Sequence, residues 1–107
     1  MGISNTFHAL SEENRQKIIE LLKEKEMSVA QIASNLSITL PTLSHHLDIL
    51  KRANLISARR QKQQIFYSLN LSAFEEITEH ITRFLSVNKN ESFVNKLKKH
   101  FNKFFKN

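Results

Sequence analysis

The chain has 107 residues, enough for one domain with one hydrophobic core and too few for a second independent one. It contains no cysteine, so disulfides, thiolate metal sites and cysteine nucleophiles are excluded. No apolar run approaches the roughly 18 residues of a membrane-spanning helix, and the N-terminus lacks the profile of a signal peptide. We therefore expect a cytoplasmic protein.

The formal net charge of +6 is unevenly distributed along the chain. The segment 49–74 carries basic side chains and no acidic one, and the segment 89–106 is a second basic block with Glu91 as its only acid. A localised cationic surface suits a polyanion such as nucleic acid or an anionic membrane. A solvated basic face that only maintains solubility is the alternative.

Two helices are predicted in the first third of the chain. Ser11, followed by two glutamates, predicts an N-cap and a helix over residues 12–24. The apolar residues of this helix gather on one side, and we expect Arg15 on the opposite, polar side. The sequence S-V-A-Q from Ser28 predicts a capping box and a short helix over residues 29–36.

A third helix is expected from Thr39, its N-cap, to about Ala53, with Pro41 tolerated in the first turn. Because only a short turn separates it from the helix before it, the pair is a helix-turn-helix candidate. We expect His46 to be a packed, hydrogen-bonded scaffold residue. The outward positions of the third helix are polar: Thr42, Ser44, His45, Asp48, Lys51 and Arg52.

After the third helix, the spacing of the apolar residues changes from the period of a helix to that of strands. Residues 55–60 and 64–69 are predicted as two strands around a polar tip, Gln61-Lys62-Gln63, and together they form a hairpin, or wing. The tip has no glycine or asparagine for a tight primed turn, so the loop type stays open.

Two amphipathic helices complete the chain. Ser72 is expected to cap a helix that continues to about residue 86, and residues 91–105 predict a last helix with phenylalanines on one side and lysines elsewhere. The predicted fold is mainly α, a winged helix-turn-helix with five helices, a two-stranded β-hairpin and an extra C-terminal helix. We expect a DNA-binding and dimerisation domain over residues 1–86 and a basic helical extension over residues 87–107.

Four sequence runs within residues 7–85 are similar to a known family. They are F-H-A-L-S-E-E-N-R-Q-K-I-I-E-L-L, P-T-L-S-H-H-L-D-I-L-K, L-I-S-A-R-R and I-F-Y-S-L-N. The segment resembles the ArsR/SmtB family of bacterial repressors, and its metal-independent autorepressor branch looks most similar. The resemblance implies a dimeric repressor that binds an inverted-repeat operator, its own promoter included.

The resemblance also implies that the recognition helix enters the major groove and that the wing reaches the flanking backbone. Short hydroxyl and imidazole side chains in the first half of such a helix can reach base edges. Leu40 and Pro41 depart from the family, because some relatives have polar contacts there. The expected recognition-helix contacts are Pro41, Thr42, Ser44, His45, Lys51 and Arg52. The expected wing contacts, chiefly to phosphates, are Arg59, Arg60, Gln61, Lys62 and Gln63.

The resemblance also implies a two-fold dimer interface, which the N-terminal segment and the helix after the wing form in the family. The expected interface residues are Phe7, Leu10, Phe74, Ile77, Ile81, Phe84 and Leu85. The apolar stripe on the second element could instead be ordinary core of one chain.

We expect neither a cofactor nor a metal. Glu76 and His80 share a helix face at i, i+4, but such pairs are usually surface polar contacts. With a single glycine the chain has no phosphate-binding loop, so an enzyme is not expected. The alternative function is a membrane-surface or protein-partner module that uses the basic helix within residues 91–107. That helix could equally pack on the dimer core.

Overall fold

The computed structural model describes residues 3–87, with the side chains of residues 5–84. The chain divides into two compact units, Met1–Asn70 and Leu71–Asn107. The predicted helix over residues 91–105 lies outside the described residues. Within the described residues, the mainly helical fold with a small antiparallel wing agrees with the prediction from sequence.

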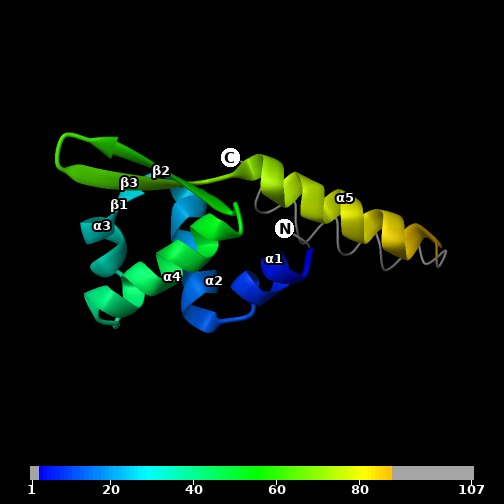
Figure 1. The fold of residues 1–107 in the computed structure, drawn as a ribbon, viewed down its shortest axis with the longest axis horizontal. Helices are drawn as coiled ribbons and strands as arrows, with labels where there is room; N and C mark the ends of the chain where they lie inside the picture. The colour runs from blue at the N-terminus through cyan, green and yellow to red at the C-terminus, as the bar shows by residue number, and fades with distance from the viewer. Residues whose placement is uncertain (1–2, 88–107) are drawn as a thin grey trace. The chain divides into compact units, whose positions relative to one another are not determined.

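The first unit consists of four helices and a small sheet, drawn in Figure 1. The helices are α1 (Ile3–Leu10), α2 (Glu13–Glu24), α3 (Val29–Ala33) and α4 (Leu40–Arg52). The strands are β1 (Met27–Ser28), β2 (Ile56–Gln61) and β3 (Gln64–Leu69). The three strands form one sheet in the order β1-β3-β2, and β3 is antiparallel to both of its neighbours. The hairpin was predicted, whereas β1 was not, because a two-residue strand has no readable period.

Helix α2 and its N-cap each begin one residue later than predicted. Its N-cap is Glu12, whose carboxylate accepts a hydrogen bond from the Arg15 backbone N–H at 2.9 Å. Ser11 instead donates its hydroxyl to the His8 carbonyl at 2.6 Å and so closes the end of α1. The prediction of Ser11 as the cap was therefore wrong, because the preceding helix uses that hydroxyl.

The capping box of α3 is confirmed. The Ser28 N–H donates to Gln31 Oε1 at 2.8 Å, and the Gln31 N–H donates to Ser28 Oγ at 3.2 Å. The helix ends at Ala33, three residues earlier than predicted. The side chains of Ser34 and Asn35 both donate to the Gln31 carbonyl, and such local bonds compete with the helical pattern.

The C-terminal end of α4 is a Schellman motif. The Leu55 N–H donates to the Leu50 carbonyl and the Asn54 N–H to the Lys51 carbonyl, both at 3.0 Å. Asn54 has φ 63°, a left-handed conformation that asparagine tolerates better than most residues. The motif turns the chain directly from α4 into β2.

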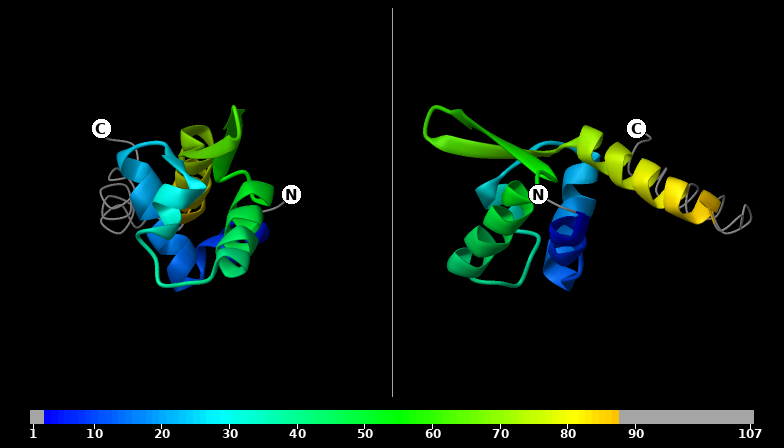
Figure 2. Two further views of the ribbon diagram at one scale, coloured as in Figure 1. Left: turned by 90° about the vertical axis from the view of Figure 1, so that its left-hand side faces the viewer. Right: turned by 45° about the vertical axis from the view of Figure 1, so that its right-hand side comes forward.

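The core of the first unit lies between the helices and the sheet. Helix α2 contacts α1, α4 and β3, and α4 contacts β2. In Figures 1 and 2 the helices lie on one side of the sheet, and the tip of the hairpin projects beyond them. The core side chains are Ile18, Ile19, Leu22, Ile32, Leu43, Leu47, Leu50, Leu55 and Ile56.

The loop of the hairpin is tighter than expected. Gln61 pairs with Gln64, so the loop contains only Lys62 and Gln63. Lys62 has φ 58°, whereas Gln63 does not have a positive φ. Positive φ at only the first loop position is typical of a type II′ turn, which normally has glycine there. The wing therefore carries local backbone strain at its tip.

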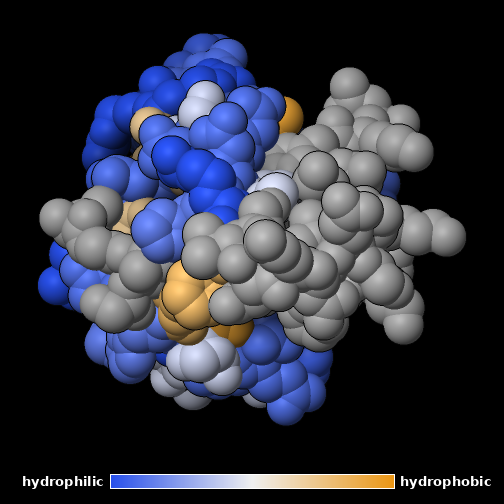
Figure 3. Space-filling view, turned by 90° about the vertical axis from the view of Figure 1, so that its right-hand side faces the viewer, coloured by the Kyte–Doolittle hydropathy of each residue, from blue (hydrophilic) through white to orange (hydrophobic). Residues whose placement is uncertain are grey.

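In the second unit, the described residues form α5 (Leu71–Val87). The helix begins before Ser72, so Ser72 is not the cap that the sequence predicted. Phe74 and Ile77 are buried, whereas the Phe84 side chain is 67% exposed. None of the described helices is long and apolar enough to cross a membrane. On the face drawn in Figure 3, the described residues are mostly hydrophilic, with a few separate hydrophobic patches.

Candidate DNA-binding interface

The N-terminal end of α4 is capped as predicted. Thr39 Oγ1 accepts a hydrogen bond from the Thr42 backbone N–H at 3.3 Å and donates one to Thr42 Oγ1 at 2.9 Å. Pro41 lies in the first turn, where its missing N–H has no cost. The Thr42 hydroxyl oxygen accepts within this cap, so its own hydrogen can still be donated to another molecule.

The outward face of α4 includes two polar side chains that form no hydrogen bond with another described residue. Ser44 and His45 are exposed, and neither side chain forms a hydrogen bond within the described part of the chain. The His45 ring lies 6.0 Å from the ring of His46, centroid to centroid. Hydroxyl and imidazole groups at adjacent positions of one exposed face can donate to or accept from base edges.

The inward face of α4 is held by His46. This side chain is only 7% exposed, and its Nδ1 lies 3.0 Å from Nη1 of the buried Arg15. A guanidinium group only donates, so Nδ1 is the acceptor in this hydrogen bond. The prediction of His46 as a hydrogen-bonded scaffold residue is confirmed.

Arg15 links three helices, which the sequence did not predict. Its Nε donates to the Ala9 carbonyl at 2.7 Å and its Nη2 to the His8 carbonyl at 3.3 Å. These carbonyls belong to the last turn of α1, which lacks helical donors. The expectation that Arg15 lies on the polar side of α2 was wrong, because helical periodicity does not reveal acceptors on other helices.

The C-terminal half of α4 carries two exposed cations in different environments. Arg52 is paired with Asp48 one turn earlier on the same helix. Lys51 forms no ion pair with any described residue. The positive charge of Lys51 is therefore the more available of the two for a phosphate group.

Arg59 of β2 is held by a network on the surface of the sheet. Its guanidinium donates to both carboxylate oxygens of Glu26, at 2.7 and 2.8 Å, and to Gln61 Oε1 at 2.8 Å. The same group lies over the Phe66 ring, with Cζ 5.0 Å from the ring centroid. The hydrogen bonds from Arg59 lower the pKa of Glu26, and those same bonds raise the pKa of Arg59.

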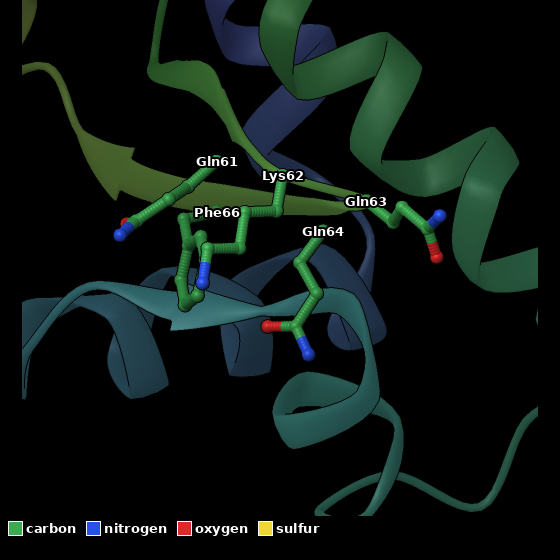
Figure 4. A pocket seen from close by; sticks show the side chains of 5 residues that line it. All are labelled: Gln61, Lys62, Gln63, Gln64 and Phe66. Atoms are coloured by element: carbon green, nitrogen blue, oxygen red, sulfur yellow. The ribbon is translucent and has the colours of Figure 1, made fainter.

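Arg60 and Lys62 differ from Arg59. Successive side chains of a strand point to opposite faces, so Arg60 lies on the face opposite Arg59. Both Arg60 and Lys62 are exposed, and neither forms an ion pair with a residue in the described range. Figure 4 shows the side chains at the tip of the wing, where Gln63 points away from the rest. A shallow pocket there is lined by Gln61, Lys62, Gln63, Gln64 and Phe66.

The residues expected at a dimer interface differ in exposure within one chain. Phe7 is 46% and Phe84 67% exposed, whereas Phe74 and Ile77 are buried. Leu10 and Ile81 are partly exposed, and the side chain of Leu85 lies outside the described set.

The remaining expectations concern metals and the C-terminal extension. Within the described residues no group of three or more His, Cys, Asp or Glu side chains could hold a metal ion. Glu76 and His80 are both exposed on α5. Residues 91–107, proposed from the sequence as a membrane or protein contact, lie outside the described residues.

The fold and this surface define a winged helix-turn-helix protein: a capped recognition helix after a short turn, followed by a β-hairpin wing. Residues 12–58 match the family described as "Bacterial regulatory protein, arsR family". The transcriptional repressor SdpR of Bacillus subtilis is 38% identical over 89 residues, which cover 83% of this chain and 99% of SdpR. The chain therefore belongs to the ArsR family, whose members are transcriptional regulators rather than enzymes.

Two further proteins are similar in fold, and the first of them also matches in sequence. The transcriptional activator HlyU of Vibrio cholerae is 32% identical over 75 residues, covering 70% of this chain and 69% of HlyU. A solved structure of HlyU has a TM-score of 0.63 and covers 77% of this chain and 89% of its own. The homodimeric winged helix-turn-helix DNA-binding domain Mb0332 of Mycobacterium bovis is 27% identical, with a TM-score of 0.62 and coverage of 83% and 80%.

Proposed function

We propose that this protein is a sequence-specific, DNA-binding transcriptional repressor that acts as a cytoplasmic homodimer on an inverted-repeat operator, its own promoter included. The observation that carries the proposal is the two-sided character of α4. Its outward face offers the unbonded groups of Ser44 and His45, and its inward face is fixed by buried contacts through His46. A rigidly held helix with free polar groups is suited to reading base edges in the major groove.

Within α4, the roles divide along the helix. Thr42, Ser44 and His45 contact base edges or their immediate surroundings, and Pro41 lies beside them in the first turn. Lys51 contacts a phosphate group, and Arg52 does so in exchange for its bond to Asp48. Phosphate contacts supply affinity and register, whereas base contacts supply sequence preference.

The wing provides the second proposed contact surface, on the DNA backbone beside the major groove. The residues predicted for it from the sequence are Arg59, Arg60, Gln61, Lys62 and Gln63. The exposed charges of Arg60 and Lys62 support the assignment, since no described acidic group neutralises them.

A second copy of the chain is proposed to cover exposed apolar residues, Phe7 on α1 and Phe84 on α5, together with Leu10, Ile81 and Leu85. The interface predicted from the sequence also includes Phe74 and Ile77, which are already buried within one chain. The homodimeric state of Mb0332 supports the proposal. Two copies related by a two-fold axis would place two recognition helices about 34 Å apart on DNA. A sedimentation profile that contains only monomer at micromolar concentration would contradict it.

Repression, rather than activation, is supported by the repressor SdpR, because nearly the whole length of SdpR matches this chain. HlyU is named an activator and matches a smaller share. Transcription in vitro from the protein's own promoter tests the direction: added protein should lower the yield of transcript, and a higher yield would contradict repression.

DNA reading is tested by fluorescence anisotropy with two duplexes, the sequence upstream of the protein's own gene and a scrambled version. The wild type should prefer the upstream duplex. His45→Ala should lose about tenfold or more in affinity for that duplex and little for the scrambled one, since one good base contact contributes about 1–3 kcal/mol. His80→Ala, an exposed histidine on α5, is the matched control. Equal weak binding of the wild type to both duplexes would refute the proposal and favour a membrane or protein partner.

A further inference from the structure

Two adjacent arginines in the wing have different surroundings. Arg59 is engaged by Glu26 through two hydrogen bonds and by Phe66 through its ring face. Arg60, on the opposite face of the strand, has no ion pair with a described residue. Sequence alone assigns both arginines the same role, as cations for phosphate groups.

We infer that Glu26 and Arg59 form a clamp that positions the wing for DNA binding, while Arg60 and Lys62 make the phosphate contacts. In this inference Glu26, an acidic residue in a basic protein, strengthens DNA binding without touching DNA. The inference rests on the proposed function and assigns separate tasks to residues of the same surface.

The clamp spans the whole width of the sheet. Glu26 directly precedes β1 at one edge, Arg59 belongs to β2 at the other edge, and β3 lies between them. Phe66 of β3 pairs with Arg59 on one side and with Ser28 on the other. The guanidinium of Arg59 therefore passes over the central strand at Phe66 to reach Glu26.

The clamp also lies where the hairpin loses its third strand. Strand β1 pairs only with Phe66 and Tyr67 of β3, so the part of the wing beyond Phe66 is a two-stranded ribbon. Such ribbons twist more strongly than larger sheets and are marginally stable alone. A bidentate bond from Arg59, in the row of Phe66, to Glu26 just before β1 limits the directions in which the tip, with Lys62, can point.

The sign of one substitution separates the clamp from simple electrostatics. Removing the negative charge of Glu26 raises the net charge of the protein, so charge alone predicts tighter binding to DNA. Loss of the clamp predicts weaker binding, because the wing must be ordered when DNA binds. The two readings therefore give opposite results for Glu26→Gln.

The test measures the affinity of the full-length protein for both duplexes across a salt series, with Arg59→Gln and Arg60→Gln as a matched pair. Glu26→Gln and Arg59→Gln should each weaken binding by up to about fivefold, the upper end of the range expected for an exposed ion pair. The double variant should be no weaker than either single variant. Arg60→Gln should reduce the slope of log affinity against log salt by about 0.9, the value for one phosphate contact. Arg59→Gln should change that slope by less than half as much.

Arg59→Lys adds a rescue experiment, because lysine keeps the charge but cannot form the bidentate bond. It should bind DNA like Arg59→Gln. Circular dichroism during thermal unfolding checks that each variant remains folded, which the exposure of both side chains favours.

Three results would overturn the clamp. They are tighter binding by Glu26→Gln, wild-type affinity of Arg59→Lys, and a slope change in Arg59→Gln equal to that in Arg60→Gln. A different result would contradict the proposed function: the wild type itself would bind the two duplexes equally. In that case the sign of the Glu26→Gln effect on the scrambled duplex still decides the inference.

Discussion

Helix α4 and the wing carry the two proposed DNA contacts, but they are attached to the core in different ways. The arginine that holds α4 in place, Arg15, is 6% exposed and bonded to two backbone carbonyls and His46. The arginine of the wing, Arg59, has a side chain that is 52% exposed and is bonded to another surface residue.

Because of this difference, we expect salt to affect the wing more than α4. Buried hydrogen bonds are weakly screened by salt, whereas interactions between exposed charges weaken over distances of about 10 Å at 0.1 M salt. The direction of α4 should therefore stay constant as salt rises, while the wing becomes less restrained. The element proposed to read sequence is the rigid one, and the adjustable element contacts the uniform backbone.

The largest expected effect is the loss of the α4 anchor. Arg15→Ala should destabilise the protein by about 3 kcal/mol, because it removes the donors of several buried acceptors at once. Urea unfolding followed by circular dichroism measures the change. Lys17→Ala, on the exposed side of the same helix and paired with Glu13, is the control and should cost less than about 0.5 kcal/mol. Equal losses of stability in the two variants would contradict the expectation that the buried Arg15 contributes more than an exposed ion pair.

A smaller effect, of opposite sign, is expected at the tip of the wing. Lys62→Gly should stabilise the protein by up to about 1 kcal/mol, because glycine adopts a φ of 58° without strain. The same substitution should weaken DNA binding and lower its salt dependence, since a proposed phosphate contact is lost. Gln63→Gly is the matched control, because its φ is not positive, and it should lower stability. A Lys62→Gly variant with both greater stability and full affinity would show that the strained lysine has no part in binding.

The smallest effect concerns the protonation of Glu26. Its pKa lies below the ordinary value of 4.5, because Arg59 donates hydrogen bonds to the carboxylate. The ion pair is therefore fully present above the ordinary value and is lost as the pH falls through the lowered pKa. Carbon-13 NMR of the carboxyl group in wild type and Arg59→Gln measures this, and the pKa should return towards 4.5 in the variant. An identical titration in both proteins would mean that the bond does not persist in solution.

Several features of the fold were readable from short stretches of sequence. The capping box at Ser28, the cap at Thr39 and the strand over residues 64–69 each depend on residues within a few positions of one another. His46 could be assigned to the scaffold because it shares a helix side with Leu43 and Leu50. The exposed candidates Ser44 and His45 followed from the same periodicity.

The features that were missed depend on partners distant in sequence. The helical period of α2 predicts that Arg15 lies among its polar, outward residues, and only the carbonyls of α1 and the ring of His46 explain its burial. Glu26 gave no signal as a candidate, because its partner Arg59 is 33 residues further along the chain. A charge near a predicted strand does not reveal which opposite charge lies across the sheet.

The sequence by itself determined α2, α3, α4, α5, the two strands of the hairpin and which face of α4 is polar, because caps, turns and hydrophobic periods act between near neighbours. The tertiary structure decided which charges are available to DNA and which are held within the protein. Those assignments depend on pairing across the sheet and on packing between helices, which bring together residues that no local pattern connects.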